Sequence, residues 1–232
     1  MIKIYRYELQ YILCNKLFIG FSCFLAIFSY YLISDTLLLG TSYTAPFSIY
    51  SFAHYCLLLL PVLFIAITSL NHLYFTDNHQ KRLIIFERCS YSKQDLRFIQ
   101  LGTLASATIL WICLILCSAL LFYLTTFHVF QPLKYFTLAF FLLLPPSLCY
   151  LWLVHRLCRN HPNLSPLLCI AFILLTQISF EINPFSSAYF IQIPLRIPLD
   201  TTLPIPLNQF LTRLLLITLP LIAEIKEKSK TS

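Results

Sequence analysis

The amino-acid sequence predicts an all-α integral membrane protein: six transmembrane helices preceded by an N-terminal amphipathic interfacial helix. Hydrophobic residues make up 59% of the 232 residues and charged residues only 11%, against about 45–50% and about 25% in ordinary soluble domains. One soluble core could not bury that much apolar surface. The apolar residues also gather into six long stretches, and a helix needs about 20 such residues to cross a bilayer. We therefore expect a single transmembrane domain over residues 1–232.

The first element, residues 1–16, is predicted to be an amphipathic helix. On a helix of 3.6 residues per turn its apolar face carries Ile2, Tyr5, Leu9 and Ile12, and its polar face carries Lys3, Arg6 and Gln10. We expect it to lie in the cytoplasmic interface and to turn into the first span near Asn15 and Lys16. The alternative is a plain cytoplasmic extension of that span. Because polar residues interrupt this region, no cleavable signal peptide is expected.

The six predicted spans cover residues 17–38, 52–73, 99–122, 135–154, 164–181 and 206–223. Prolines within them, Pro61, Pro145, Pro146 and Pro220, are expected to kink their helices. Residues 182–205 are rich in proline, and unpaired backbone groups are costly in lipid. We therefore interpret residues 182–205 as an external cap or a re-entrant hairpin.

The lysine and arginine residues predict the orientation. Alternate segments outside the spans hold 3, 5, 2 and 3 of them on one side of the membrane, and 0, 1 and 1 on the other. Since cytoplasmic loops carry the excess of positive charge, both termini are expected in the cytoplasm. An even number of spans requires the same arrangement.

The sequence carries little that points to catalysis or to a cofactor. The nine cysteines form no CxxC pair and no zinc-type spacing, so we interpret them as packing residues. No GxxxxGK phosphate-binding loop occurs, and no HExxH or paired carboxylate motif lies inside a span. We expect no enzymatic activity in this chain, no cofactor, no metal and no nucleic-acid partner.

The loop between the second and third spans, residues 74–98, combines three features. Asp77 follows the second span, an apolar patch runs from Leu83 to Phe86, and Ser92 is a good helix N-cap with Asp95 three residues later. The loop also carries five basic residues. A loop that merely joined two helices would have little use for the apolar patch. The alternative is that its basic residues only set the topology and anchor anionic lipids.

This layout resembles a membrane subunit of an ABC-2 type transporter, the permease family of many bacterial exporters. Such subunits are similar in their interfacial N-terminal helix, six spans, cytoplasmic termini and short coupling segment between spans two and three. The family's usual Gly-Thr before the apolar patch and Pro before the Ser are missing here. The resemblance implies a multi-pass permease in the bacterial cell membrane, a separate ABC ATPase subunit, and a second permease copy in a homodimer or heterodimer.

The resemblance also implies which residues transmit the work of the ATPase. The ATPase-coupling candidates are Asp77, Phe86, Glu87, Arg88, Tyr91, Ser92 and Lys93. A second set consists of polar residues inside spans, which are functional candidates because charge is costly in lipid: Glu181, Arg213, His54 and Gln177. Glu181 and Arg213 can pair if the last two spans are neighbours, whereas a later start of the sixth span would leave Arg213 in an outer vestibule. A structural pair or a snorkelling arginine is favoured over a substrate site.

Two further function classes stay open from the sequence. One is an accessory or immunity-type membrane protein that works by interaction alone. The other is an ion-coupled secondary carrier, which would want several acidic residues inside the spans, where only Glu181 comes close.

Overall fold

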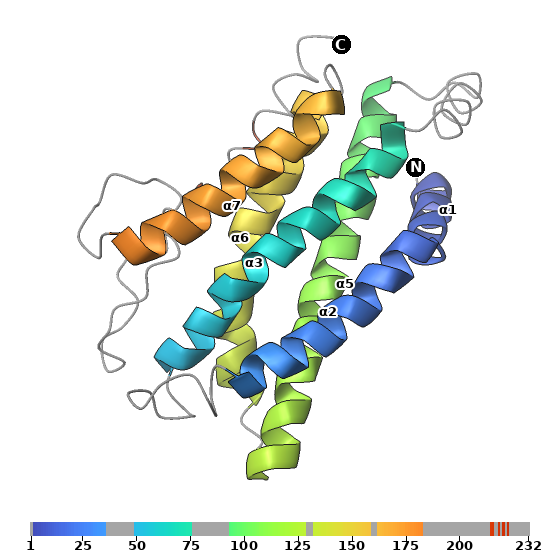
Figure 1. The fold of residues 1–232 in the computed structure, drawn as a ribbon. Helices are drawn as coiled ribbons and strands as arrows, with labels where there is room; N and C mark the ends of the chain where they lie inside the picture. Colours follow the sequence, from blue (N-terminus) through green and yellow to red (C-terminus); the bar gives the residue numbers. More distant parts are fainter. Residues whose placement is uncertain are drawn as a thin grey trace.

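The computed structural model is almost entirely helical over the residues that it describes (Figure 1). These are residues 2–35, 49–75, 93–128, 132–158 and 162–182, with five single residues between 214 and 222. The helices are α1 (Ile2–Leu13), α2 (Lys16–Ser34), α3 (Ile49–His72), α5 (Lys93–Phe127), α6 (Pro132–Cys158) and α7 (Ser165–Ile182). Two short 3-10 helices, η2 (Leu73–Phe75) and η3 (Pro162–Leu164), follow α3 and precede α7.

Three of the described helices are long and apolar enough to cross a membrane. These segments are Lys16–Ser34, Tyr55–Phe75 and Asp95–Phe127, and the shorter apolar stretches Leu142–Cys158 and Ser165–Leu174 lie in α6 and α7. Large apolar side chains are exposed on the outer surfaces of these helices, among them Phe24, Ile27, Leu121, Leu167 and Ile170. Exposed apolar surface on this scale supports a chain that lies in a bilayer, where lipid covers it.

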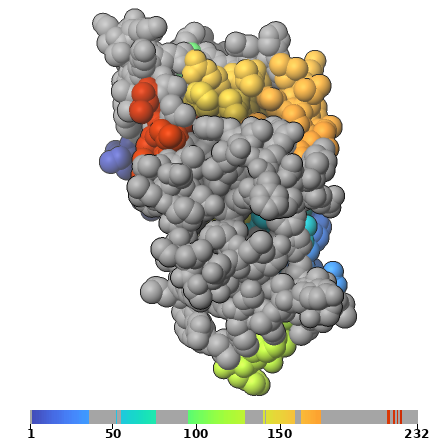
Figure 2. All heavy atoms as spheres, turned by 90° about the vertical axis from the view of Figure 1, so that its left-hand side faces the viewer, coloured from blue at the N-terminus to red at the C-terminus, as the bar shows by residue number. Residues whose placement is uncertain are grey.

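α5 extends well beyond the third predicted span, residues 99–122. Its 35 residues correspond to about 52 Å at 1.5 Å per residue, whereas the hydrocarbon core is about 30 Å thick. The helix therefore continues past the apolar layer, and its first turns run directly on from residues 76–92. In Figure 2 the surfaces of α6 and α7 are adjacent, and the last turns of α5 lie at the opposite end of the molecule.

α2 and α5 run side by side in the same direction. The ring of Phe18 stacks on Trp111 with centroids 5.2 Å apart, and Tyr30 contacts Phe122 at 5.7 Å nearly the same number of residues further along both helices. The indole N–H of Trp111 donates a hydrogen bond to the Ser22 hydroxyl at 2.9 Å. Aromatic stacking and this bond fix the register of the pair.

α3 and α6 also run in the same direction, opposite to α2 and α5 (Figure 1). The rings of Phe64 and Tyr150 lie 4.6 Å apart, and the Tyr150 hydroxyl contacts the Thr68 hydroxyl. α3 occupies the centre of the bundle, where it packs against α2, α5, α6 and α7. Successive long helices thus alternate in direction, as consecutive membrane spans must.

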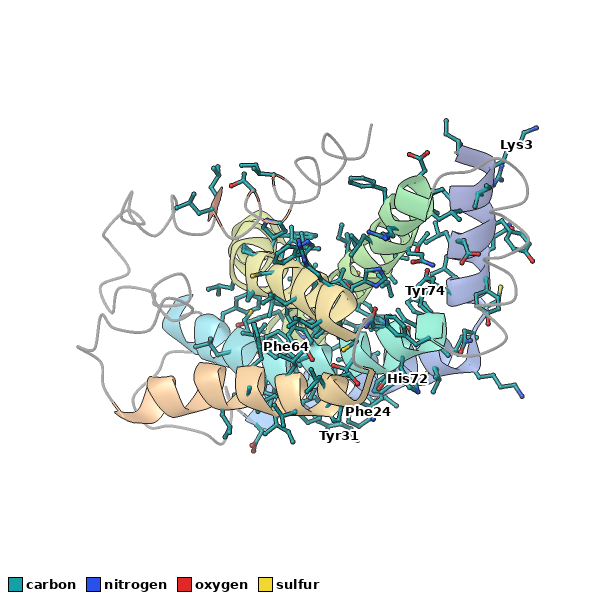
Figure 3. The ribbon with its side chains drawn as sticks, turned by 90° about the horizontal axis from the view of Figure 1, so that it is seen from above. Lys3, Phe24, Tyr31, Phe64, His72 and Tyr74 are labelled. Carbon is teal, nitrogen blue, oxygen red and sulfur yellow. The ribbon has the colours of Figure 1, made fainter. Side chains whose placement is uncertain are left out.

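α1 crosses the flank of α5: Figure 3 shows α1 from the side, whereas α5 is seen nearly end-on. The chain then turns at Cys14 and Asn15, where the sequence predicts a turn, and the Asn15 side-chain oxygen caps α2 by accepting the Leu17 N–H at 2.8 Å. The division of α1 into faces differs from the expectation. Ile2, assigned to the apolar face, is 84% exposed, and Glu8 is buried at 3%. Because α1 crosses α5, Ile2, the first residue of α1, lies beyond the contact between the two helices.

Candidate functional site

The two helices that border residues 76–92 are bonded to each other inside the bundle. η2 ends at Phe75 and α5 begins at Lys93. The buried hydroxyl groups of Tyr74 and Thr103 lie 2.6 Å apart. Since the Thr103 hydroxyl donates to the Gln100 carbonyl at 2.8 Å, the Tyr74 hydroxyl is the donor to Thr103. This hydrogen bond joins the element before residues 76–92 to the element after them, and these residues belong to the loop predicted to couple to an ATPase.

A second polar contact joins α3 to α6 one turn earlier along α3. The Asn71 side-chain oxygen lies 2.9 Å from Nδ1 of His155, and both side chains are buried. As this amide is oriented, its oxygen accepts, so Nδ1 of His155 carries the proton. The imidazole also packs edge-on against Tyr74, with ring centroids 6.3 Å apart, and lies 6.1 Å from the Phe75 ring. His155 therefore packs against η2, the 3-10 turn that contains Tyr74.

A third contact fastens α1 to α5. The hydroxyls of Tyr5 and Ser106 lie 2.6 Å apart, and Ser106 donates to the Gly102 carbonyl at 2.9 Å. The Tyr5 hydroxyl is therefore the donor to Ser106. The Tyr5 ring lies beside Gly102, where an added Cβ would be at an ordinary contact distance of 3.5 Å from Cε2 of Tyr5. α1 and η2 thus bond to α5 within one turn, at Ser106 and Thr103.

Positive charge is concentrated at this end of the described structure. Six basic residues lie here, in α1, in the first two turns of α2 and α5, and in the last turn of α6: Lys3, Arg6, Lys16, Lys93, Arg97 and Arg156. Lys134 lies in the first turn of α6, at the opposite end of the bundle. The Arg156 guanidinium also lies over the Trp152 ring, 5.4 Å from its centroid, a cation–π contact. We call the end that carries these six residues the basic end.

Most of the candidate residues predicted from the sequence lie outside the described part of the chain. This applies to Asp77, Phe86, Glu87, Arg88, Tyr91, Ser92 and Arg213. Lys93 is the first residue of α5, His54 lies in α3, and Gln177 and Glu181 lie in α7; for these four the helix is described but the side chain is not. The predicted external segment, residues 182–205, lies outside the description after Ile182, and the sixth predicted span is described only at single residues.

Sequence reasoning missed the polar residues that tie the basic end together: Asn71, Tyr74, Thr103, Ser106 and His155. A signal for them exists in the sequence. Asn71 and Tyr74 are three residues apart, as are Gln100 and Thr103, and both pairs lie where apolar stretches meet the basic loop. Polar residues at this spacing share one helix face. What the sequence lacks is any indication that the two faces meet.

The chemistry of the basic end is that of a structural link. Its buried groups include hydroxyls, an amide and an imidazole that bond to one another. Within the described ranges, no three His, Cys, Asp or Glu side chains are grouped so that they could hold a metal ion. The eight described cysteines form no disulfide. Comparison of the chain with protein-family models, with curated proteins and with solved structures found no match.

Proposed function

We propose that this chain is the membrane-spanning permease subunit of an ABC-2 type, ATP-driven exporter. It forms the translocation pathway with a second permease copy and is coupled to a separate ATPase subunit. The observation that carries the proposal is the buried Tyr74–Thr103 bond, which joins the two helices on either side of residues 76–92. A segment that receives a push from a soluble partner needs such rigid attachment at both ends.

The packing supports a route by which the push would spread. Because α5 carries α1 through Tyr5–Ser106 and α2 through Trp111–Ser22, these three helices would move together. α3 holds α6 through Asn71–His155 and packs against α7. ATP-driven closure of the ATPase would displace residues 76–92 and rock the helices attached to them between inward- and outward-facing states.

The proposed topology has six spans: α2, α3, α5, α6, α7 and residues 206–223. α6 and α7 contain 27 and 18 residues, or about 40 Å and 27 Å of helix, against a hydrocarbon core of about 30 Å. Both are long enough to span with modest tilt or local thinning. With the basic end facing the cytoplasm, both termini are cytoplasmic, α1 lies in the cytoplasmic interface, and the chain resides in the bacterial plasma membrane.

Co-purification from the native host in a mild detergent tests this function. The tagged chain should retain a Walker-A ATPase in stoichiometric amount, with ATP hydrolysis that vanadate inhibits. Combining Glu87→Ala with Lys93→Ala should abolish the retention, because both residues lie in or next to the coupling segment. Lys134→Ala is the matched control, because it removes a positive charge from the opposite end of the bundle. If no such ATPase associates with the intact chain, the permease function is wrong and an accessory role takes its place.

A further inference from the structure

The outward face of α1 has an unusual composition. Tyr5, Glu8 and Ile12 lie toward the bundle, as the Tyr5–Ser106 bond and the burial of Glu8 and Ile12 show. Glu8 is the only acidic residue among residues 1–34. With this carboxylate turned inward, the exposed face of α1 carries positive charge alone, from Lys3 and Arg6. Lys3 lies at the outer end of the helix in Figure 3.

The same face is not purely polar. Tyr7 is 54% exposed and Ile2 is 84% exposed, and both stand beside the two cations. An aromatic ring, an aliphatic side chain and basic groups on one exposed face are typical of a helix at the boundary between lipid tails and headgroups. A surface that binds a soluble protein in water does not need such a mixture of aromatic, aliphatic and basic groups next to helices that face lipid.

The start of α2 fixes the depth of α1 relative to the apolar layer. α2 begins at Lys16, and its next outward residues are apolar, with Leu17 43% exposed and Ile19 51% exposed. The apolar surface therefore starts immediately after Lys16. Since α1 runs along the edge of the bundle, roughly perpendicular to the long helices, just before this point (Figure 3), we place it at the level of the lipid phosphates.

We propose that the outward face of α1, together with Lys16, is a binding site for the headgroups of anionic phospholipids. Lys3, Arg6 and Lys16 supply the charge, and Tyr7 and Ile2 insert beside the glycerol backbone and the upper tails. A basic residue near an anionic leaflet contributes a favourable interaction of about 1 kcal/mol, which corresponds to about a fivefold tighter binding per charge. The site depends on the membrane placement of the helices and not on coupling to an ATPase.

Lipid retention by the purified full-length chain tests the site. The delipidated protein is equilibrated in mixed micelles of phosphatidylglycerol and phosphatidylcholine, and bound lipid is counted by native mass spectrometry. We expect preferential retention of phosphatidylglycerol. This preference should weaken as salt is raised from 0.05 to 0.5 M, because the electrostatic screening length is then halved roughly one to two times. Each of Lys3→Gln, Arg6→Gln and Lys16→Gln should lower the preference about fivefold.

Two controls make the outcome decisive. Lys134→Gln removes a charge at the opposite end of the bundle and should leave the preference unchanged. If the triple Gln variant cannot be purified, the salt titration of the unmodified chain decides. Equal retention of the two lipids, or a triple variant that keeps the preference, overturns the site. If the triple variant loses a co-purifying ATPase but keeps its lipid preference, the face docks protein, and the lipid site is likewise overturned while the transport proposal stands.

Discussion

The Tyr74 hydroxyl donates a hydrogen bond to the Thr103 hydroxyl across 2.6 Å inside the bundle, between two residues 29 positions apart in the chain. Tyr74 belongs to the 3-10 turn that ends the α3 segment, and Thr103 lies three turns into α5. The segment between Phe75 and Lys93 is therefore attached at each end to an element of the bundle, and the Tyr74–Thr103 bond joins these two elements.

Removing either hydroxyl of this pair should loosen the basic end without altering the surface. We expect Tyr74→Phe and Thr103→Val each to lower the free energy of unfolding by roughly 0.6 kcal/mol and by no more than about 1.7 kcal/mol, the average and the maximum measured for hydrogen bonds between membrane helices. Denaturant unfolding of the singles and the double gives the coupling energy. Thr125→Val is the control in the same helix, because Thr125 is exposed and, among the described residues, bonds to carbonyls of its own helix. Strictly additive effects of the two substitutions would contradict the bond.

The Asn71–His155 contact should obey the asymmetry of buried hydrogen bonds. His155→Phe keeps a ring against Tyr74 and Phe75 but leaves the buried Asn71 oxygen without its donor, at a cost of about 1–3 kcal/mol. Adding Asn71→Leu should recover most of that loss, because both polar partners are then gone. Among the described residues the Asn71 Nδ2 group has no hydrogen-bond partner, which adds to the expected recovery. A double variant less stable than His155→Phe alone would refute this account.

Gly102 should tolerate one methyl group and no more. A Cβ there lies at ordinary contact distance, 3.5 Å, from the Tyr5 ring, so Gly102→Ala is expected to be neutral or to stabilise by up to about 1 kcal/mol through helix propensity. Gly102→Leu should push Tyr5 off Ser106 and cost about 1–3 kcal/mol. Thermal unfolding in detergent, with protease sensitivity of α1 as a second readout, measures both effects.

Gly20 provides the comparison, because an added Cβ at that position would meet nothing within 4 Å. Gly20→Leu should therefore not destabilise the chain: helix propensity should leave the stability unchanged or raise it by up to about 1 kcal/mol, and the protease sensitivity of α1 should stay the same. Equal losses at Gly20 and Gly102 would mean that the crossing of α1 over α5 is not what limits side-chain size.

The orientation of the bundle can be read by thiol labelling. Cys14 is exposed at the basic end, and Thr126 is exposed near the last turn of α5 at the other end. In a chain whose other cysteines are replaced, Cys14 should react with a membrane-impermeant maleimide only after spheroplasts are opened. A single cysteine at Thr126→Cys should react from outside in intact spheroplasts. The reverse pattern would place the basic end outside and contradict the proposed topology.

Much of the architecture can be read from composition and periodicity. Long apolar stretches predict helices because a bilayer leaves no other way to satisfy the backbone of a single span, and the structure has helices over the described residues of the first three predicted spans. The change of direction at Asn15 is visible in advance because a polar residue that caps a helix stands between an amphipathic and an apolar segment. These features depend on neighbours in the chain.

The faces of α1 show where such reasoning ends. Helical periodicity groups Ile2 with Tyr5 and Ile12, yet Ile2 is exposed and the charged Glu8 is buried. Which side of a helix is covered depends on how it crosses its neighbour, and α1 meets α5 through Tyr5, Gly102 and Ser106, which lie on two separate helices. The way α1 crosses α5 cannot be predicted from residues 1–16 alone.

By itself, the sequence determined that this chain is helical, apolar enough for a membrane, and basic on alternate segments. Only the tertiary structure decided that Asn71 meets His155, that Tyr74 meets Thr103 and that Tyr5 meets Ser106. Partition into lipid is a sum over residues, so composition suffices to predict it. A hydrogen bond requires two groups within about 3 Å of each other, and the packing of whole helices is what brings them there.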